Sequence, residues 1–292
     1  MELLRAQWAK GKFVCVGLDS EFGKIPESVR QGGNECIVSV ANTIVAFNRA
    51  IIEATKDLAF AYKPNAAFYE AYGDEGFNAL HRTIVDIHIL APDVPVILDA
   101  KVADIGNTNN GYVQMAFDYL QADAITVHPY LGAEALAPFL DRADKGVIVL
   151  CRTSNPGAGE FQDRMVPGDD LPGGANGHLP LYQYIAWRVA NHWNKNGNCA
   201  LVVGATYPDE LALVRMIVGD MPILIPGVGF QQKGVPIEKQ VEQVVSSGKD
   251  SRREGMIINS SRGIIFASKG ADFADWAREE TWKLHNLINQ YR

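Results

Sequence analysis

The stretch VPVILDAK (94–101) has the pattern of a buried strand, and this pattern indicates the fold of the chain. It is a short apolar run that ends in Asp99 and Lys101, and it is too short for a buried helix. Runs of the same kind recur at FVCVGLD (13–19), LAFAYKPN (58–65), AITVHPY (124–130), GVIVLCR (146–152), ALVVGA (200–205), PILIPGV (222–228) and MIINSS (256–261). Strands this apolar are typical of a parallel sheet that is covered on both faces.

Amphipathic segments separate these runs. In residues 36–55, 77–90 and 209–219, apolar residues return every three or four positions, which is the period of a helix with one buried face. Strands that alternate with helices indicate a parallel α/β sheet, and eight strands are the number that closes a barrel. We predict a (β/α)8 TIM barrel, a single domain over residues 1–292, with a long loop after strand 5.

This fold predicts where the functional groups lie. In such barrels, reactive side chains sit at the carboxyl ends of the strands and in the loops that follow. Most of the expected strand ends carry polar residues or glycine: Asp19, Lys63, Asp99, Lys101, His128, Arg152, Ser154, Gly227, Gly229, Ser261 and Arg262. The sequence therefore predicts one site at one mouth, with His128 in a packing or hydrogen-bonding role rather than a catalytic one.

The spacing D-x-K-x-x-D at Asp99, Lys101 and Asp104 predicts acid–base chemistry. Residues two apart on a strand share a face, so Asp99 and Lys101 are expected within ion-pairing reach, with Asp104 just beyond the strand. Two carboxylates keep an ammonium group protonated, and a positioned lysine ammonium is a general acid. Lys63, at another strand end, extends this to an alternating charge array.

Two other interpretations of the array are open. It is also consistent with a structural belt of ion pairs at the barrel rim, although so dense a group of charges is costly to desolvate. Clustered aspartates also suit Mg²⁺. Lys101 already neutralises them, however, so we predict no metal.

The last two expected strands end in PGVGFQQKG (226–234) and NSSRG (259–263), which predict a phosphate site. In this fold the loops after strands seven and eight often bind phosphate through backbone N–H groups. Arg262 supplies a charged contact and Gln231 an amide donor. The expected ligand is a phosphorylated small molecule.

A long segment rich in Gly, Pro and Asp, residues 152–180, follows the fifth expected strand. Loops of this length without apolar periodicity are usually functional or disordered. Its place at the mouth predicts a lid, and Ser154 at its start is expected to touch the substrate.

Composition excludes several classes of protein. The net charge is −7 and no basic patch is present, which argues against a nucleic-acid-binding protein. We find neither an apolar run of membrane-span length nor one of signal-peptide length. The four cysteines lack C-x-x-C spacing, so we expect reduced, mostly buried thiols in a cytoplasmic protein.

The stretch ILDAKVADIGNT (97–108) resembles the signature of the orotidine 5′-phosphate decarboxylase family. The resemblance extends along the chain and looks like the longer bacterial subgroup. Further matching stretches are GLD (17–19), YKPN (62–65), SNPG (154–157), PGVGFQ (226–231) and SSRG (260–263).

The resemblance implies decarboxylation of orotidine 5′-phosphate to uridine 5′-phosphate, without cofactor or metal. It implies that Lys101 donates the proton to C6, that Asp99 lies against the substrate carboxylate, and that Lys63 and Asp104 complete the array. The implied substrate-binding residues are Asp19 and Lys63 for the ribose, Ser154 for the pyrimidine, and Pro226, Gly229, Gln231 and Arg262 for the phosphate end. Asp104, Ile105 and Thr108 are implied to reach the neighbouring subunit's site, so the resemblance predicts a homodimer with shared active sites.

Two competing functions are also considered. A Mg²⁺-dependent sugar-phosphate decarboxylase or aldolase uses the same D-x-K-x-x-D array, and EDTA would abolish its activity. A non-catalytic nucleotide-binding barrel would bind ligand and form no product.

Overall fold

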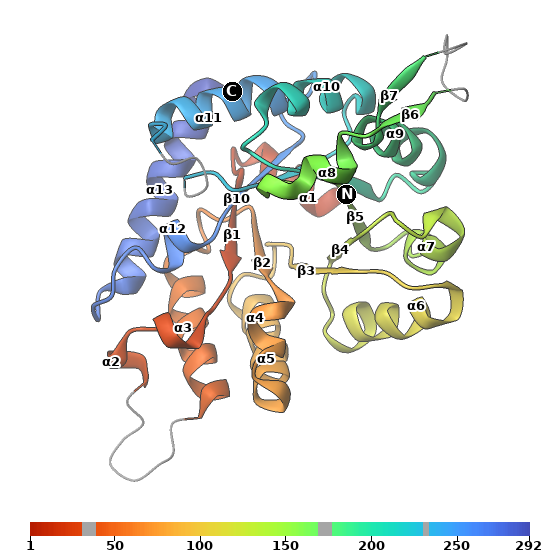
Figure 1. Cartoon of the computed structure of the whole chain (residues 1–292). Coiled ribbons are helices and arrows are strands. Elements are labelled where there is room, and N and C mark those ends of the chain that lie inside the picture. Colours follow the sequence, from red (N-terminus) through yellow and green to blue (C-terminus); the bar gives the residue numbers. More distant parts are fainter. Residues whose placement is uncertain (31–38, 169–176, 230–233) are drawn as a thin grey trace. The chain divides into compact units, whose positions relative to one another are not determined.

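A computed structural model of the chain describes residues 1–30, 39–168, 177–229 and 234–292. It divides into two compact units, each assembled from segments that are distant in sequence. The first contains Met1–Ala100, Val113–Thr126 and Ile257–Gln290, and the second contains Lys101–Tyr112, Val127–Met256 and Tyr291–Arg292. Figure 1 shows the course of the chain. Organisation as a single domain stays a prediction.

All eight expected strands are present, within a few residues of their predicted bounds. They form one sheet with the strand order β2-β1-β10-β9-β8-β5-β4-β3. Their bounds are β1 Val14–Leu18, β2 Ala61–Pro64, β3 Ile97–Val102, β4 Ala124–Val127, β5 Gly146–Arg152, β8 Cys199–Val203, β9 Ile223–Pro226 and β10 Met256–Ser260.

The pairing of these strands is that of a closed parallel sheet. Strand β1 runs parallel to both β10 and β2, and β8 runs parallel to both β5 and β9. β2 and β3 stand at opposite ends of the strand order, yet parallel bridges link Tyr62 to Val96 and Asn65 to Asp99. The (β/α)8 barrel predicted from the sequence is confirmed.

Helices follow the strands along the chain. The longer ones are α1 Glu2–Ala9, α3 Val40–Thr55, α5 Gly73–Leu90, α6 Gly106–Val113, α7 Gly132–Leu140, α9 Leu181–Arg188, α10 Pro208–Val218, α11 Ile237–Gly248 and α13 Phe273–Tyr291. The short ones are α2 Glu27–Arg30, α4 Ala66–Glu70, α8 Gly159–Gln162, α12 Arg262–Ile265, η1 Phe22–Lys24, η2 Gln114–Tyr119, η3 Pro156–Ala158 and η4 Val189–Trp193. Helices α3, α5 and α10 confirm the three amphipathic segments of the sequence.

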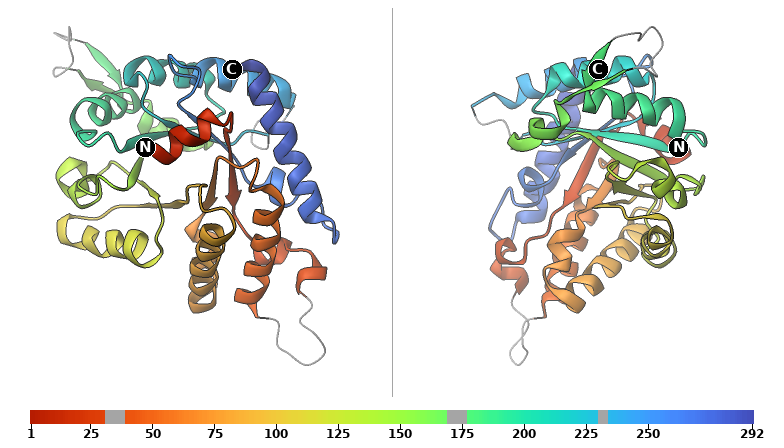
Figure 2. Two further views of the ribbon diagram at one scale, coloured as in Figure 1. Left: turned by 180° about the vertical axis from the view of Figure 1, so that it is seen from behind. Right: turned by 45° about the vertical axis from the view of Figure 1, so that its right-hand side comes forward.

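Packing in the first unit follows from helix periodicity. Ile44, Phe47 and Ile51 of α3 are fully buried, at the i, i+3, i+7 spacing of one helical face. The Ser39 hydroxyl accepts a hydrogen bond from the Asn42 amide and caps the helix N-terminus. Helices α3 and α5 lie side by side in both figures of the whole chain (Figures 1 and 2).

The segment after β5 differs from the unstructured loop expected there. It contains η3, α8 and an antiparallel hairpin of β6 Met165–Pro167 and β7 His178–Pro180, which lies beside α9 (Figure 1). Each hairpin strand has only three residues, too few to show an alternating pattern in the sequence. The expected lid role stays a prediction.

The described cysteines are buried thiols, as expected from their spacing in the sequence. Cys15, Cys151 and Cys199 are free and buried, and Cys36 lies outside the described residues. Burial raises the pKa of each of the three buried thiols to about 12. Within the described ranges, no helix has the length and apolarity needed to cross a membrane.

Candidate active site

A buried ion pair joins the ends of β2 and β3 in the first unit. Lys63 Nζ lies 2.6 Å from Asp99 Oδ2, and the two side chains are only 3% and 9% exposed. Burial by itself would lower the pKa of Lys63, but the charges of Asp99 and Asp19 outweigh it, and the pKa is raised above its ordinary value. Two members of the expected array, Lys63 and Asp99, are therefore in direct contact, with the lysine charged.

Thr126, on β4, is a further partner of Asp99. Its hydroxyl donates a hydrogen bond of 2.9 Å to Asp99 Oδ1, so the two carboxylate oxygens have different partners. Sequence reasoning missed this residue. A threonine in a strand is ordinary, and no local pattern links positions that are 27 residues apart.

Asp19 follows β1 and belongs to the same unit. Its Oδ1 atom is buried and has no hydrogen-bond partner among the described residues, and its charge acts on Lys63. A buried carboxylate oxygen without a donor is costly unless a ligand supplies one. Asp19 is thus suited to accept hydrogen bonds from ligand hydroxyl groups.

Lys101 has an unusual backbone. It lies at the start of the second unit with φ of 52°, in the left-handed region that non-glycine residues rarely adopt. Its side chain is exposed. Such backbone strain persists only where the surroundings enforce it, and it is concentrated at functional sites.

The turn after β3 holds Asp104 through its backbone. Asn109 Oδ1 accepts from the Asp104 amide at 2.8 Å, and Asn109 Nδ2 donates to the carbonyl oxygens of Asp104 and Ala135. Ile105 is 66% exposed, and Thr108 is exposed in the first turn of α6. Asn109 is a second residue that the sequence analysis missed.

The expected array is thus divided between the two units. Lys63 and Asp99 form a direct contact in the first unit, whereas Lys101 and Asp104 lie in the second. The boundary falls within β3, between Ala100 and Lys101. Assembly of all four residues into one array stays a prediction.

The expected phosphate residues are divided in the same way. Pro226 ends β9, and Gly229 follows with φ of 86°, a conformation that favours glycine. The Gly229 amide donates to Gln240 Oε1 at 3.0 Å, a contact that the sequence analysis did not anticipate. Arg262 begins α12 in the first unit, and Gln231 lies outside the described residues.

His128, at the end of β4, donates its backbone amide to the Val102 carbonyl. Its Nδ1 atom is buried and has no partner in the part of the chain that the structure describes. Ser154 follows β5, and its surroundings are described below. Among the described residues, no three His, Cys, Asp or Glu side chains gather as metal ligands would.

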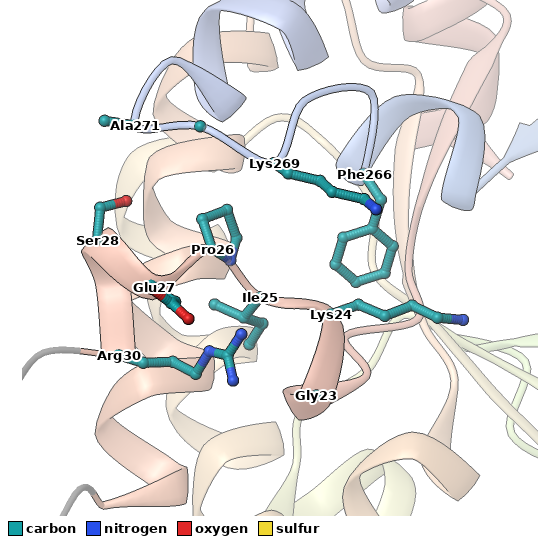
Figure 3. A pocket seen from close by; sticks show the side chains of 11 residues that line it. Gly23, Lys24, Ile25, Pro26, Glu27, Ser28, Arg30, Phe266, Lys269 and Ala271 are labelled. Carbon is teal, nitrogen blue, oxygen red and sulfur yellow. The ribbon is translucent and has the colours of Figure 1, made fainter.

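A pocket of about 620 Å³ lies elsewhere in the first unit (Figure 3). Residues 23–28, Arg30, Phe266 and 269–271 line it, and none of them is an expected site residue. Lys24 and Lys269 are exposed, and Lys24 pairs with Glu21 at 2.7 Å. This pocket is therefore separate from the residues that the sequence predicts for the active site.

Comparisons of sequence and of structure with known proteins identify the same family. Residues 13–274 match the model of the orotidine 5′-phosphate decarboxylase / HUMPS family. A relative named orotidine 5′-phosphate decarboxylase from Cellvibrio japonicus is 42% identical over all of this chain and 98% of its own length. A second, from Ralstonia pickettii, is 44% identical with the same coverage. The solved Leishmania donovani OMP decarboxylase superposes with a TM-score of 0.77 at 35% identity, over 99% of this chain and 98% of that chain.

Proposed function

Because the chain belongs to the orotidine 5′-phosphate decarboxylase / HUMPS family, we propose that it converts orotidine 5′-phosphate to uridine 5′-phosphate and carbon dioxide in pyrimidine nucleotide synthesis. The observation that carries this proposal is the full-length identity of 42–44% to relatives that bear that name. The enzyme is a carboxy-lyase.

The charged residues have distinct roles in this reaction. The bond from C6 to the carboxylate carbon breaks, its electron pair remains on C6, and Lys101 Nζ supplies the proton that replaces carbon dioxide. The Lys101 ammonium stabilises the carbanion as it develops. Asp99 lies against the substrate carboxylate, Asp104 completes the array, and the buried contact of Lys63 with Asp99 supports these assignments.

The remaining residues bind the substrate. Asp19, whose buried Oδ1 has no partner among the described residues, and Lys63 hold the ribose hydroxyls, and Ser154 contacts the pyrimidine. The phosphate is bound by Arg262, Gln231 and the backbone between Pro226 and Gly229. The reaction uses neither metal nor organic cofactor.

The protein acts as a homodimer in the cytoplasm. Asp104, Ile105 and Thr108 reach the neighbouring subunit's site, and the exposure of Ile105 and Thr108 leaves them accessible to a second subunit. Three free buried thiols support a reducing compartment, where disulfides are rare.

The test is an ultraviolet assay of orotidine 5′-phosphate consumption in EDTA, with the native protein and Lys101→Ala. We expect the native protein to turn over, and Lys101→Ala to bind uridine 5′-phosphate but to lose at least about 10³-fold in kcat, because its proton donor is absent. Lys239→Ala removes an exposed lysine of α11 and should leave kcat unchanged.

Two results would contradict the proposal. If a folded native protein consumes no orotidine 5′-phosphate but binds uridine 5′-phosphate, the chain is a nucleotide-binding barrel. If it acts on a keto-sugar phosphate and EDTA abolishes that activity, the Mg²⁺-dependent alternative is correct.

A further inference from the structure

A buried arginine, Arg152, lies at the end of β5, two residues before Ser154. The Arg152 side chain is 3% exposed, and its Nε atom lies 3.0 Å from Asp163 Oδ1. Nη2 donates to Asp163 Oδ2 at 3.1 Å, and the guanidinium carbon lies 3.9 Å from the centre of the Tyr207 ring. Arg152 therefore joins three segments of the second unit: the end of β5, the residue after α8, and the turn after β8.

These contacts close the segment from residue 152 to residue 163 into a loop. Inside it, Gln162 Oε1 accepts from the Thr153 amide and Gln162 Nε2 donates to the Thr153 hydroxyl, both at 2.8 Å. The Thr153 hydroxyl in turn donates to Asn155 Oδ1 at 2.7 Å. The residues on both sides of Ser154 are therefore held by side chains of the same loop.

The turn after β8 supports Ser154 from the other side. Thr206 donates its hydroxyl to the Ser154 carbonyl at 3.2 Å. A methyl group on Gly204 would lie 2.5 Å from the Ser154 Cβ atom, so the backbones approach as closely as glycine permits. The Gly204 amide also donates to the Arg152 carbonyl at 2.8 Å.

We propose that Arg152, Asp163 and Tyr207 are positioning residues that hold Ser154 against the pyrimidine of the bound nucleotide. We name this group the Arg152 clasp. The proposal rests on the proposed function, because Ser154 meets a base only if the substrate is a pyrimidine nucleotide. None of the three clasp residues is assigned a contact with the reacting atoms.

The chemistry of the clasp requires an arginine. A planar guanidinium can face a carboxylate along one edge and an aromatic ring with its face, and a lysine ammonium cannot do both. Ordering Ser154 before the substrate arrives removes an entropic cost from binding of the base. Arg152→Lys should therefore weaken recognition of the base while the positive charge is kept.

The experiment compares ligands with and without a base, by calorimetric titration. We expect Arg152→Lys and Asp163→Asn to weaken uridine 5′-phosphate binding about tenfold and to change ribose 5-phosphate binding less than twofold. In a Ser154→Ala background, Arg152→Lys should weaken binding of uridine 5′-phosphate no further, because both changes remove the same contact. Asp163→Asn keeps the experiment interpretable if the Arg152 variant fails to fold, since Asp163 is 47% exposed.

The control is Arg278→Lys, which alters an Arg–Asp pair of the first unit and should change neither affinity. Equal weakening of both ligands, or additive effects of Arg152→Lys and Ser154→Ala, would overturn the proposal. The titrations need no turnover, so a native protein that lacks decarboxylase activity would refute the proposed function and would still leave the clasp testable.

Discussion

At the scale of single residues, the hydroxyl of Thr126 is an uncharged partner of Asp99. Its hydrogen bond fixes one carboxylate oxygen while Lys63 binds the other. Hydrogen bonds to charged groups contribute about 1.5–3 kcal/mol. The orientation of Asp99 therefore depends on this hydroxyl as well as on the ion pair.

We predict that Thr126→Val lowers kcat/KM about 10- to 100-fold, because each tenfold corresponds to about 1.4 kcal/mol. Thr126→Ser retains the hydroxyl and should stay within about threefold of the native value. Steady-state kinetics measures both. Thr281→Val removes a buried hydroxyl that donates to the Ala277 carbonyl in α13, and it should leave kcat/KM unchanged. Equal losses in the Val and Ser variants would show that the hydroxyl is not responsible.

Backbone strain at Lys101 predicts a conflict between activity and stability. With φ of 52°, any residue with a side chain is disfavoured by about 1–2 kcal/mol relative to glycine. We therefore expect Lys101→Gly to unfold in urea with a free energy about 1 kcal/mol higher than Lys101→Ala, with both variants inactive.

At Lys239 we expect the opposite order of stability for the glycine and alanine variants. Lys239 lies within α11, where glycine costs about 1 kcal/mol relative to alanine. Lys239→Gly should be the less stable variant there. If glycine were the less stable choice at both positions, the strain assigned to Lys101 would be absent.

At the scale of elements, β1 packs tightly against the chain that follows β10. A methyl group on Gly17 would lie 1.9 Å from Ser261 Oγ and 2.8 Å from Ser261 Cβ. Ser261 immediately precedes Arg262, the expected phosphate-binding residue. The absence of a side chain at Gly17 thus determines where the end of β10 lies.

We predict that Gly17→Ala lowers the free energy of unfolding by about 1–3 kcal/mol, as overpacking does, and raises KM because Arg262 moves with Ser261. Ser261→Gly removes the clashing atoms and should restore much of both quantities in the double variant. Gly23→Ala, whose methyl group would meet no atom of the described residues within 4 Å, should be neutral. Chemical denaturation and steady-state kinetics measure the two effects, and failure of Ser261→Gly to rescue would contradict the packing argument.

At the scale of the whole molecule, shared active sites make a specific prediction about mixed dimers. If one subunit supplies Lys101 and the other supplies Asp104 to each site, a dimer of Lys101→Ala with Asp104→Ala contains one intact site. The two inactive variants, unfolded together and refolded at equal amounts, should then recover about a quarter of native activity by statistical pairing of subunits. No recovery, with dimers present by light scattering, would place both residues in the same subunit.

The sequence by itself determined the barrel and identified two charged residues, Asp99 and Lys63, that meet at its strand ends. The lengths of the apolar runs and the period of the segments between them are local properties, so they predicted all eight strands and the helices α3, α5 and α10. The D-x-K-x-x-D spacing is equally local. It identified Asp99, and the polar end of a second apolar run identified its partner Lys63.

Only the tertiary structure decided which uncharged residues contact the charged side chains at the strand ends. Thr126 beside Asp99, and Tyr207 over Arg152, join positions far apart in the chain whose residue types are unremarkable where they stand. The strain at Lys101 is likewise a property of the folded backbone. A sequence pattern reports the secondary-structure preference of each segment. These contacts join residues on or just after neighbouring strands, and such strands are adjacent only once the sheet has formed.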